Sequence, residues 1–397
     1  MKKTADILTL AVFIAIIAVF GVMFWVMEDN AVSDTEGRNL QQLPEFTLER
    51  LNSGEYALEI NTYFSDQFPF RDKFVTVKAL AELCLLKGEN NGVLYGDDGM
   101  LAVKDFNAKN ETGAANTATD SFNEDFVSAQ LEKLNSFVTN IQTPTAVVIP
   151  PRVIDIAGSS FSYPADSAEA FEKLVNSYLG DKDWFVELDS LFTEKHENGE
   201  YVYYKTDHHW TSLGAYYCYV EIMKSFGMDY YDLSEFNVQT VSDSFLGSTY
   251  RASGFGFYGD SDIIDIYYLK GTSESDYLTE ICNPRTNELM HGFSGFYDSS
   301  YLAKSDKYSF FLSGTNVYTR VTRLDGVKRE KLLIVKDSFA HSLVPFLALH
   351  FDLEIINYES DGMQNVTKLA EQYSADRILL VYNAENIITS GKLVNLR

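Results

Sequence analysis

The fold is decided by the stretch Lys331-Leu332-Leu333-Ile334-Val335, which is followed by Lys336-Asp337-Ser338-Phe339. A short continuous apolar run is typical of a parallel strand buried on both faces, because a strand with one face in water alternates apolar and polar side chains. Two more strands are predicted at 353–358 and 377–383, with helices between them at about 340–349 and 366–373. This alternation predicts an α/β fold with a doubly wound parallel sheet and helices on both faces.

The preceding part of the chain continues the same pattern. Residues 124–141 place apolar side chains at helical spacing, and the apolar run 145–149 follows as another buried strand. A helix, a short strand and a second helix are then predicted over 171–179, 184–188 and 211–223. The segment 235–329 mixes Gly, Ser and Tyr with short β-like runs, and we interpret it as an irregular, β-rich insertion.

The N-terminus carries an uncharged apolar run from Ile7 to Met27. As a helix it spans about 31 Å, at about 1.5 Å per residue, which is close to the ~30 Å hydrocarbon core of a bilayer. Two lysines precede the run and two acidic residues follow it, so the positive-inside rule predicts a single-pass anchor in the cytoplasmic membrane with the main domain outside (N-in, C-out). A cleaved signal peptide is the alternative, but its apolar region is usually only about 7–15 residues long.

These features divide the chain into three predicted parts. Residues 1–30 form the transmembrane anchor, and residues 31–123 form an N-terminal extension of the exported region. Residues 124–397 form the α/β domain, with the insertion at about 235–329.

Charge and cysteine content exclude several classes of function. The formal net charge of −25 argues against nucleic-acid binding, because a polyanion would be repelled. Cys84, Cys218 and Cys282 are far apart and odd in number, which predicts neither a structural zinc site nor a disulfide framework.

Polar residues follow three of the predicted strands, at the carboxyl ends where ligands bind in open parallel sheets. These residues are Ser338, Arg152 and Asn383. A serine hydroxyl is a weak nucleophile until a base takes its proton and a third group orients that base. Asp207 and His209 are the residue types that can supply this pair, so a Ser-His-Asp triad is one interpretation of the sequence.

Each of these residues also has a simpler interpretation. A serine or aspartate between a strand and a helix is commonly an N-cap, and adjacent histidines are often packed or surface residues. His341 is a second candidate base, ranked below His209. Asp207-His208-His209 is also a candidate metal site for a phosphoesterase, but the other histidines form no further ligand cluster in the sequence, so we expect no metal.

Four motifs resemble the DHHW family. They are the signature Thr206-Asp207-His208-His209-Trp210, the serine block Lys336-Asp337-Ser338-Phe339 with Pro345-Phe346-Leu347, the N-terminal block Asp66-Gln67-Phe68-Pro69-Phe70-Arg71, and the turn Ser313-Gly314-Thr315-Asn316. This family in turn looks like the SGNH-type O-acetyltransferases of alginate and cell-wall polysaccharide modification (AlgJ/AlgX type). The resemblance therefore implies an SGNH-hydrolase-like fold.

The resemblance also implies a role for each residue of the site. Ser338 is the nucleophile, His209 the base and Asp207 the acid that orients the base, while His208 takes the variable middle position. The serine block lacks the glycine of ordinary SGNH proteins, so the donors that stabilise the oxyanion do not carry over.

Candidates for binding the oxyanion or the substrate are taken from the neighbouring motifs. The Ser338 amide, Asn316 and Arg152 are the candidate oxyanion donors, in that order, and Asn383 is a further candidate at a strand end. Trp210 and its aromatic neighbours, among them Tyr203 and Tyr204, suit stacking on sugar rings, although we expect most of these aromatic side chains to pack in the core.

The function implied by the resemblance is transfer of an acyl group, in particular acetyl, to a hydroxyl of an envelope or secreted polysaccharide, without a metal or organic cofactor. The acyl donor would have to cross the membrane, so the implied partner is a multi-pass membrane acyltransferase. Two alternatives stay open. One is an SGNH-type carbohydrate esterase that uses the same triad with water, and the other is a non-catalytic envelope or polysaccharide-binding protein.

Overall fold

The computed structural model describes residues 2–33, 38–104, 122–161, 166–256, 260–358, 365–389, 393 and 396. The chain forms two compact units, which are Met1–Asn91 with Arg251–Tyr258, and Gly92–Tyr250 with Gly259–Arg397. Residues 105–121, in the predicted N-terminal extension, lie outside the described residues.

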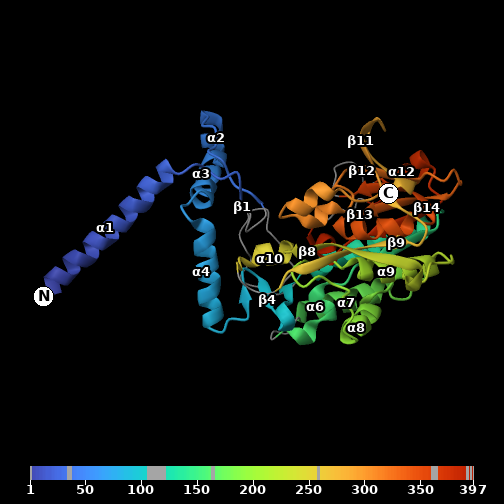
Figure 1. Ribbon diagram of the computed structural model, residues 1–397, viewed down its shortest axis with the longest axis horizontal. Coiled ribbons are helices and arrows are strands. Elements are labelled where there is room, and N and C mark those ends of the chain that lie inside the picture. The colour runs from blue at the N-terminus through green and yellow to red at the C-terminus, as the bar shows by residue number, and fades with distance from the viewer. Residues whose placement is uncertain are drawn as a thin grey trace. The chain divides into compact units, whose positions relative to one another are not determined.

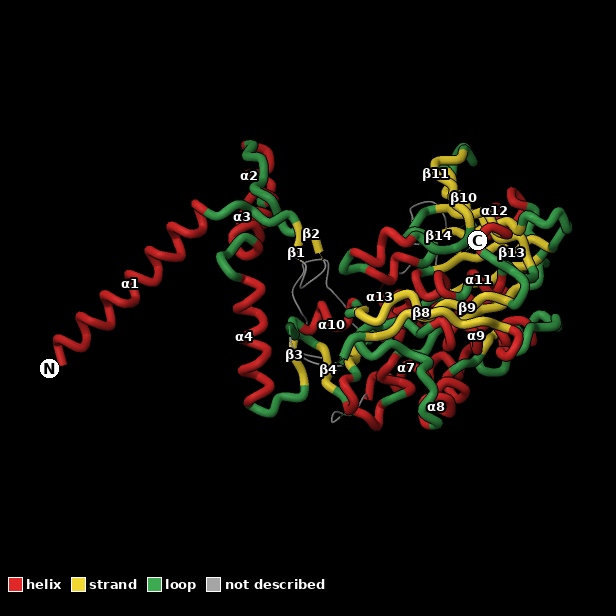
Figure 2. The backbone as a smooth tube through the Cα atoms, in the orientation of Figure 1, coloured by secondary structure: helices red, strands yellow, loops and turns green. Residues whose placement is uncertain are grey.

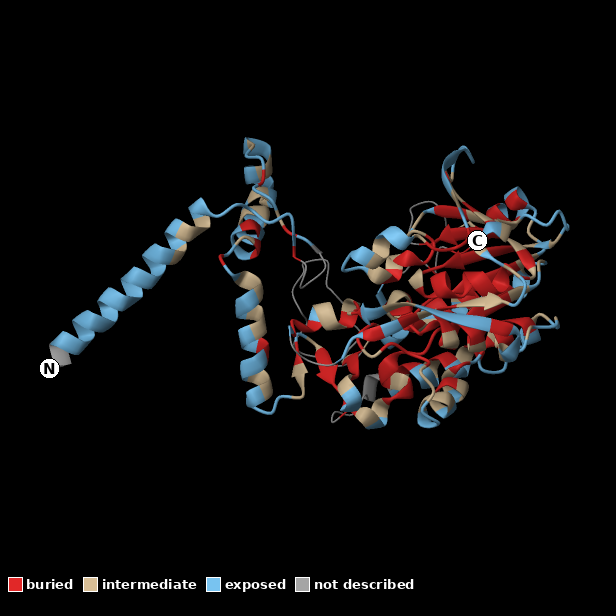
Figure 3. Ribbon diagram, in the orientation of Figure 1, coloured by how far each residue is buried: buried red, intermediate tan, exposed pale blue. Residues whose placement is uncertain are grey.

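The smaller unit is mainly helical. In its first helix, α1 (Lys2–Val26), the segment Thr4–Val26 is long and apolar enough to cross a membrane, and it is largely exposed (Figure 3). Thr47 caps the start of α2 (Leu48–Ser53) by accepting a hydrogen bond from the Arg50 N–H. Gly54 ends α2 with a φ of 82°, which glycine adopts without a Cβ clash. The remaining elements are β1 (Val32–Ser33), β2 (Arg38–Asn39), α3 (Glu55–Asp66), α4 (Arg71–Cys84) and β3 (Glu89–Asn90).

The larger unit is built on an eight-stranded mixed sheet with the strand order β11-β10-β12-β14-β13-β15-β6-β7. Strands β11, β12, β13 and β14 of this sheet are labelled in Figure 1. The strands from β14 to β7 pair in parallel, which confirms the predicted parallel α/β sheet. In the register, Leu332 of β13 lies opposite Leu353 of β14 and Arg377 of β15. The parallel strands are β6 (Thr145–Val148), β7 (Phe185–Val186), β13 (Glu330–Lys336), β14 (Phe351–Asn357) and β15 (Arg377–Val381).

Each face of this sheet carries its own apolar core. In β13, Leu332 and Ile334 pack into one core with α9 and α11, and Leu333 and Val335 pack into the other with α5, α7 and α12. Burying each such side chain contributes about 1.5–3 kcal/mol, which explains why both faces of these strands are apolar. Figure 3 shows that the interior of the larger unit is mostly buried. The helices are α5 (Glu124–Asn140), α6 (Val153–Ile156), α7 (Asp166–Leu179), α8 (Asp189–Glu197), α9 (Ser212–Ser225), α11 (Val344–Leu347), α12 (Val366–Tyr373) and α13 (Ala384–Thr389).

The region predicted as a β-rich insertion is rich in strands, and part of it continues the main sheet. Strands β10, β11 and β12 extend the sheet from β14 by antiparallel pairing, while β8 and β9 form a separate two-stranded ribbon (Figure 2). The bounds are β8 (Phe236–Phe245), α10 (Ser248–Ser253), β9 (Asp262–Leu269), β10 (Tyr277–Cys282), β11 (Leu289–Ser294) and β12 (Tyr318–Arg323). Elsewhere in this unit, β4 (Val93–Tyr95) pairs with β5 (Leu101–Val103).

Short 3-10 helices complete the chain. They are η1 (Asp97–Gly99), η2 (Gly158–Ser160), η3 (Leu233–Glu235), η4 (Glu274–Asp276), η5 (Ser299–Ala303), η6 (Lys307–Phe310) and η7 (Ser338–Ser342). The last of these corrects the α-helix expected at about 340–349, where the structure has η7 followed by the single-turn helix α11. Pro345 has no N–H and so cannot donate the backbone bond that would continue one helix through this point.

Candidate active site

Ser338 lies directly beyond the carboxyl end of β13. The carboxylate of Asp337 caps the turn by accepting a hydrogen bond from the Phe339 N–H at 3.0 Å, and Ser338 is the first residue of η7. The serine is only partly buried, whereas its two neighbours in the chain are buried. Among the described residues, no hydrogen bond uses the Ser338 N–H as its donor, which keeps this amide a candidate donor to a ligand oxygen.

Asp207 and His209 come from a tight hairpin between α8 and α9. Tyr203 and Trp210 form an antiparallel bridge across it, and the Thr211 N–H donates to the Val202 carbonyl at 2.9 Å. This backbone pairing holds the residues between them in a closed turn.

The structure brings Ser338, His209 and Asp207 together. Nδ1 of His209 lies 2.5 Å from Oδ1 of Asp207, and Nε2 of His209 lies 2.7 Å from Oγ of Ser338. An ionised carboxylate can only accept hydrogen bonds, so Nδ1 carries the proton and Nε2 is left to accept the proton of the serine hydroxyl. This tautomer is the one that a general base requires.

Burial and neighbouring charges set the protonation states of this pair. Asp207 is 2% exposed and His209 4% exposed. Burial lowers the pKa of His209, and the nearby His208 lowers it further, which outweighs the opposing effect of Asp207. Burial by itself would raise the pKa of Asp207, but the charges of the two histidines and the hydrogen bonds to its oxygens lower it well below its usual range. The base is therefore neutral and the acid ionised near pH 7.

Residues from the region 235–329 hold Asp207 in place. The Ser248 N–H donates to Oδ2 of Asp207 at 2.6 Å, and Gly247 packs so closely that a Cβ there would lie 2.2 Å from the Cβ of Asp207. The buried carboxylate of Asp262 accepts hydrogen bonds from the backbone N–H groups of Lys205 and Thr206, each at 2.8 Å. These contacts fix the start of the hairpin.

Tyr308 completes the wall behind the base. Its ring stacks on the imidazole of His209, with centroids 3.8 Å apart and planes 8° from parallel. Its hydroxyl donates to the carbonyl oxygen of Ser338 at 3.2 Å. One side chain thus contacts both the base and the residue that carries the hydroxyl.

The aromatic residues expected to stack on sugars are buried. Trp210 is fully buried, and its indole N–H lies 3.0 Å from both the carbonyl oxygen of Phe339 and the hydroxyl of Ser342. Tyr203 and Tyr204 are buried as well. The sugar-stacking prediction is therefore wrong for these three rings, because they pack into the core, and Trp210 instead ties the hairpin to η7.

The remaining candidates lie at the same edge of the sheet but are engaged in local structure. The Asn316 amide donates to carbonyl groups of its own loop, including that of Leu312 at 3.2 Å. The guanidinium of Arg152 donates to Asp155 at 2.8 Å, and the Asn383 N–H donates to Asp337 at 2.6 Å. In the described structure, no hydrogen bond connects Asn316, Arg152 or Asn383 with Ser338.

The Asp207-His208-His209 cluster places three potential ligand atoms within 4.8 Å of one another. However, His209 uses Nδ1 for Asp207 and Nε2 for Ser338, and Nδ1 of His208 lies 2.6 Å from the Ser248 hydroxyl. Both oxygens of Asp207 also accept hydrogen bonds. A metal would have to displace these contacts, so the donor set does not fit a metal site.

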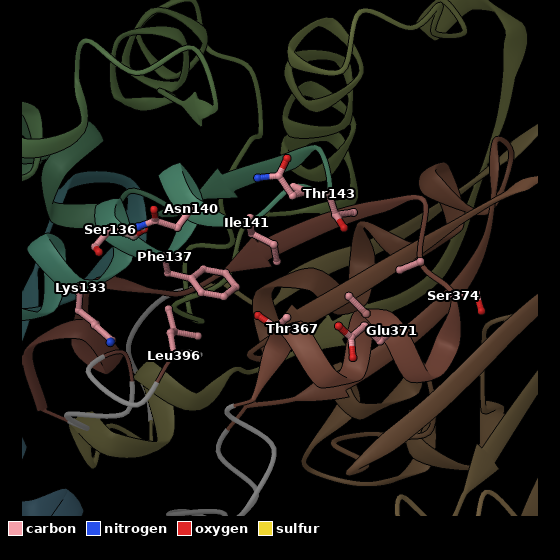
Figure 4. A pocket seen from close by; sticks show the side chains of 13 residues that line it. Lys133, Ser136, Phe137, Asn140, Ile141, Thr143, Thr367, Glu371, Ser374 and Leu396 are labelled. Atoms are coloured by element: carbon pink, nitrogen blue, oxygen red, sulfur yellow. The ribbon is translucent and has the colours of Figure 1, made fainter.

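One pocket lies beside Ser338, and a second, larger pocket lies at the other edge of the sheet. The small pocket beside Ser338 is lined by residues that include Arg152, His208 and Phe339. A pocket of about 620 Å³ lies elsewhere, between the end of α5 and α12, where side chains such as Lys133 and Glu371 surround it (Figure 4). Those helices lead into the amino ends of β6 and β15, so this larger pocket is at the opposite edge of the sheet from the serine.

Four residues of the site were missed by the sequence reasoning. Gly247, Ser248, Asp262 and Tyr308 all come from the aperiodic region that was interpreted only as β-rich. No spacing rule relates them to the hairpin, because their contacts arise from tertiary packing.

Comparison with known proteins shows what this part of the chain resembles. The family described as DHHW protein matches residues 171–356, which confirms the predicted resemblance over the part of the chain that contains the hairpin and Ser338. Among curated protein sequences, none matches the chain.

Three solved structures are similar to this chain at low sequence identity, and the two with TM-scores above 0.5 show the same fold. A DHHW family protein from Eubacterium siraeum is 17% identical with a TM-score of 0.55, covering 77% of this chain and 95% of its own. Bacillus cereus PatB1, solved with a sulfonyl adduct, is 17% identical with a TM-score of 0.58, covering 76% and 97%. The O-acetyltransferase domain of Pseudomonas putida AlgJ is 12% identical with a TM-score of 0.43, covering 75% and 92%.

Proposed function

We propose that this DHHW-family chain is a membrane-anchored, extracytoplasmic O-acyltransferase that moves an acetyl group to a hydroxyl of an envelope or secreted polysaccharide. The observation that carries the proposal is the chain of contacts from Asp207 through His209 to Ser338, at 2.5 and 2.7 Å. Nucleophile, base and orienting acid are all within hydrogen-bond reach, which is the geometry that acyl transfer through a serine requires.

The reaction runs in two halves. The Ser338 oxygen attacks the carbonyl carbon of the acyl donor while its proton passes to Nε2 of His209, and that proton then leaves with the departing group. In the second half, His209 takes the proton of the acceptor hydroxyl while the acceptor oxygen attacks the carbonyl carbon of the acyl-serine. The bond between that carbon and Oγ of Ser338 then breaks, which leaves the new ester, and the proton returns from His209 to the serine oxygen. Asp207 stabilises the imidazolium that forms in each half.

The oxyanion of each tetrahedral intermediate needs donors near the serine. The Ser338 N–H is the first candidate, since it has no partner among the described residues. Asn316 and Arg152 would have to exchange their present local contacts to take part.

The membrane arrangement belongs to the same proposal. Residues 1–30 would anchor the chain with its N-terminus in the cytoplasm, residues 31–123 would form the exported extension, and residues 124–397 would carry the chemistry. The helix Thr4–Val26 supports this by its length and composition. A multi-pass membrane acyltransferase would deliver the acyl group, since acyl donors are made inside the cell.

Labelling with a serine-directed fluorophosphonate tests the triad, and a sulfonyl fluoride serves as a second probe. We expect the wild-type protein to be labelled, and the Ser338→Ala and His209→Ala variants to be unlabelled. Ser248→Ala is the matched control, because it removes a hydroxyl beside the site but keeps the backbone N–H that binds Asp207. Equal labelling of all variants, or no labelling of the wild type, would refute the triad.

A second assay separates transfer from hydrolysis. Wild-type protein that reacts with the serine-directed probe is incubated with an activated acetyl ester, once with and once without a glycan fragment as acceptor. Acetylated glycan supports the transferase, whereas release of acetate that is unaffected by the glycan favours the esterase.

A further inference from the structure

An apolar groove of about 450 Å³ lies between α1 and the chain around Phe64 and Phe68. Phe20 stacks on Phe68 with centroids 5.4 Å apart, and Phe24 lies 5.2 Å from Phe64. The other lining residues, among them Ile16 and Ile17, are also apolar, and no charged side chain lines the groove. Such a surface is unfavourable in water, so it needs an apolar occupant.

The groove lies on the segment that is long enough to cross a membrane. The segment ends at Val26, and Phe20 lies about 9 Å before that end along the helix axis, at about 1.5 Å per residue. If α1 spans the bilayer, Phe20 lies inside the outer leaflet, and Phe68, whose ring stacks on it, must share that depth. The contacts therefore place part of the chain after α1 at the level of the lipid.

Helix α4 extends this apolar surface. Phe70 lies just before α4, and one face of the helix continues from it. The apolar side chains on this surface are 44–60% exposed, and they are Phe70, Phe74, Val77 and Leu80. Their spacing of three and four residues puts them on one side of the helix, while Ala79 on another side is fully buried. Lys73 is exposed at the start of this face, with its Nζ 5.6 Å from the centre of the Phe70 ring, whereas Lys78 contacts Asn90 and Glu82. An exposed apolar helix face with a lysine that can reach the headgroups is the pattern of a helix that lies in the membrane interface.

We propose that the groove binds an acyl chain of a membrane lipid, and that the apolar face of α4 lies in the outer leaflet of the same bilayer. This inference rests on the proposed membrane anchor. Binding of the acyl chain and of the α4 face would hold the smaller unit against the membrane surface more firmly than α1 does alone.

A helix of a membrane partner is the other possible occupant, and the walls of the groove argue against it. Close packing between transmembrane helices favours small residues at the contact. Here Gly21 is the single small residue among the groove residues, and the walls are formed by phenylalanine, isoleucine and tryptophan side chains. Flexible acyl chains fill such an uneven surface better than a second helix does.

Fluorescence quenching by lipids brominated on their acyl chains tests the proposal. The full chain is reconstituted alone into vesicles in a Trp25→Phe background, in which Trp184 and Trp210 remain, and a tryptophan is introduced by Phe68→Trp, Phe74→Trp, Val12→Trp or Thr62→Trp. The fluorescence of the Trp25→Phe protein is measured in the same vesicles and subtracted, so that each variant reports only its introduced tryptophan. Val12 reports whether α1 enters the bilayer. Thr62 is the matched control, because it is exposed and lies about 200° around α3 from Phe64.

The expected result is that the Phe68→Trp and Phe74→Trp variants lose as large a fraction of their fluorescence as Val12→Trp, and that Thr62→Trp loses much less. If Val12→Trp is not quenched, the anchor itself fails. If Val12→Trp is quenched but Phe68→Trp and Phe74→Trp behave like Thr62→Trp, this inference is overturned while the anchor stands.

A photo-crosslinking arm identifies the occupant in cells. A benzophenone amino acid replaces Phe68 in the full chain, and the purified product is weighed by mass spectrometry after irradiation. An added mass equal to that of a membrane lipid supports the proposal, whereas a discrete protein adduct in its place overturns it in favour of a membrane partner.

Discussion

Replacing Asp207 with Asn separates the role of its charge from that of its shape. Oδ1 accepts hydrogen bonds from both Nδ1 and the backbone N–H of His209, at 2.5 and 3.0 Å, and Oδ2 accepts one from the Ser248 N–H at 2.6 Å. An asparagine has only one acceptor oxygen, so in either orientation its NH₂ group faces at least one backbone N–H. Leaving that buried N–H without an acceptor costs about 1–3 kcal/mol of stability.

The effect on reactivity should be larger than the effect on stability. If the asparagine NH₂ donates to Nδ1 of His209, the imidazole proton moves to Nε2, which then points a hydrogen at the Ser338 hydroxyl and can no longer accept its proton. The same substitution in a serine protease lowers turnover by about 10⁴, which corresponds to about 5 kcal/mol at 1.36 kcal/mol per tenfold change. We expect a loss of this order in the rate constant of fluorophosphonate labelling.

The assay measures this rate constant together with thermal unfolding of the same sample, so that loss of fold is not mistaken for loss of reactivity. Asp298→Asn is a suitable control, because it removes a charge from a surface loop that caps η5. A folded Asp207→Asn variant that labels within about tenfold of the wild type would refute the reasoning, since the tautomer of His209 would then not depend on the carboxylate.

Four further outcomes follow from the site. In Gly247→Ala the new methyl group meets the Cβ of Asp207 at 2.2 Å, so we expect a stability loss of about 1–3 kcal/mol, seen in thermal unfolding, and an unchanged midpoint would contradict this packing. Tyr308→Phe keeps the ring on His209 and should label nearly as fast as the wild type, whereas Tyr308→Leu should label more slowly; equal rates would exclude a positioning role for the ring. Labelling should fall as His209 becomes protonated, and because burial lowers its pKa, the midpoint should lie below about pH 6.5, so a midpoint above that value would contradict the environment described. Incubation with EDTA should leave labelling of Ser338 unchanged, while a loss restored by Zn²⁺ would support a metal site instead.

The parallel part of the fold was predictable because its signals are local. Strand β13 carries the apolar run 332–335, and the structure buries these residues in two separate cores, one on each face of the sheet. The antiparallel extension by β10, β11 and β12 was not predictable, because strand pairing across a long aperiodic region depends on which edge of the sheet is open. The break between η7 and α11 was visible in principle at Pro345, although the apolar pattern around it favoured one continuous helix.

The residues of the candidate site also divide into those that the sequence predicts and those whose place depends on packing. Asp207, His209 and Ser338 were selected from the sequence, because residue type, predicted strand ends and the family motif all point to these positions. Trp210, by contrast, was assigned to the substrate, and its complete burial shows that an aromatic motif residue cannot be placed on a surface or in a core by type alone.

By itself, the sequence determined the membrane-length helix, the strand and helix alternation, and the identity of the residues that can carry acyl chemistry. These properties follow from apolar periodicity and side-chain chemistry, which act over a few neighbouring residues. Only the tertiary structure decided that Nε2 of His209 lies 2.7 Å from the Ser338 hydroxyl, and that Ser248 and Tyr308 hold the base and its acid in place. The physical reason is that such distances depend on how β13, the hairpin before α9 and the region 235–329 pack together, and packing is a property of the whole core.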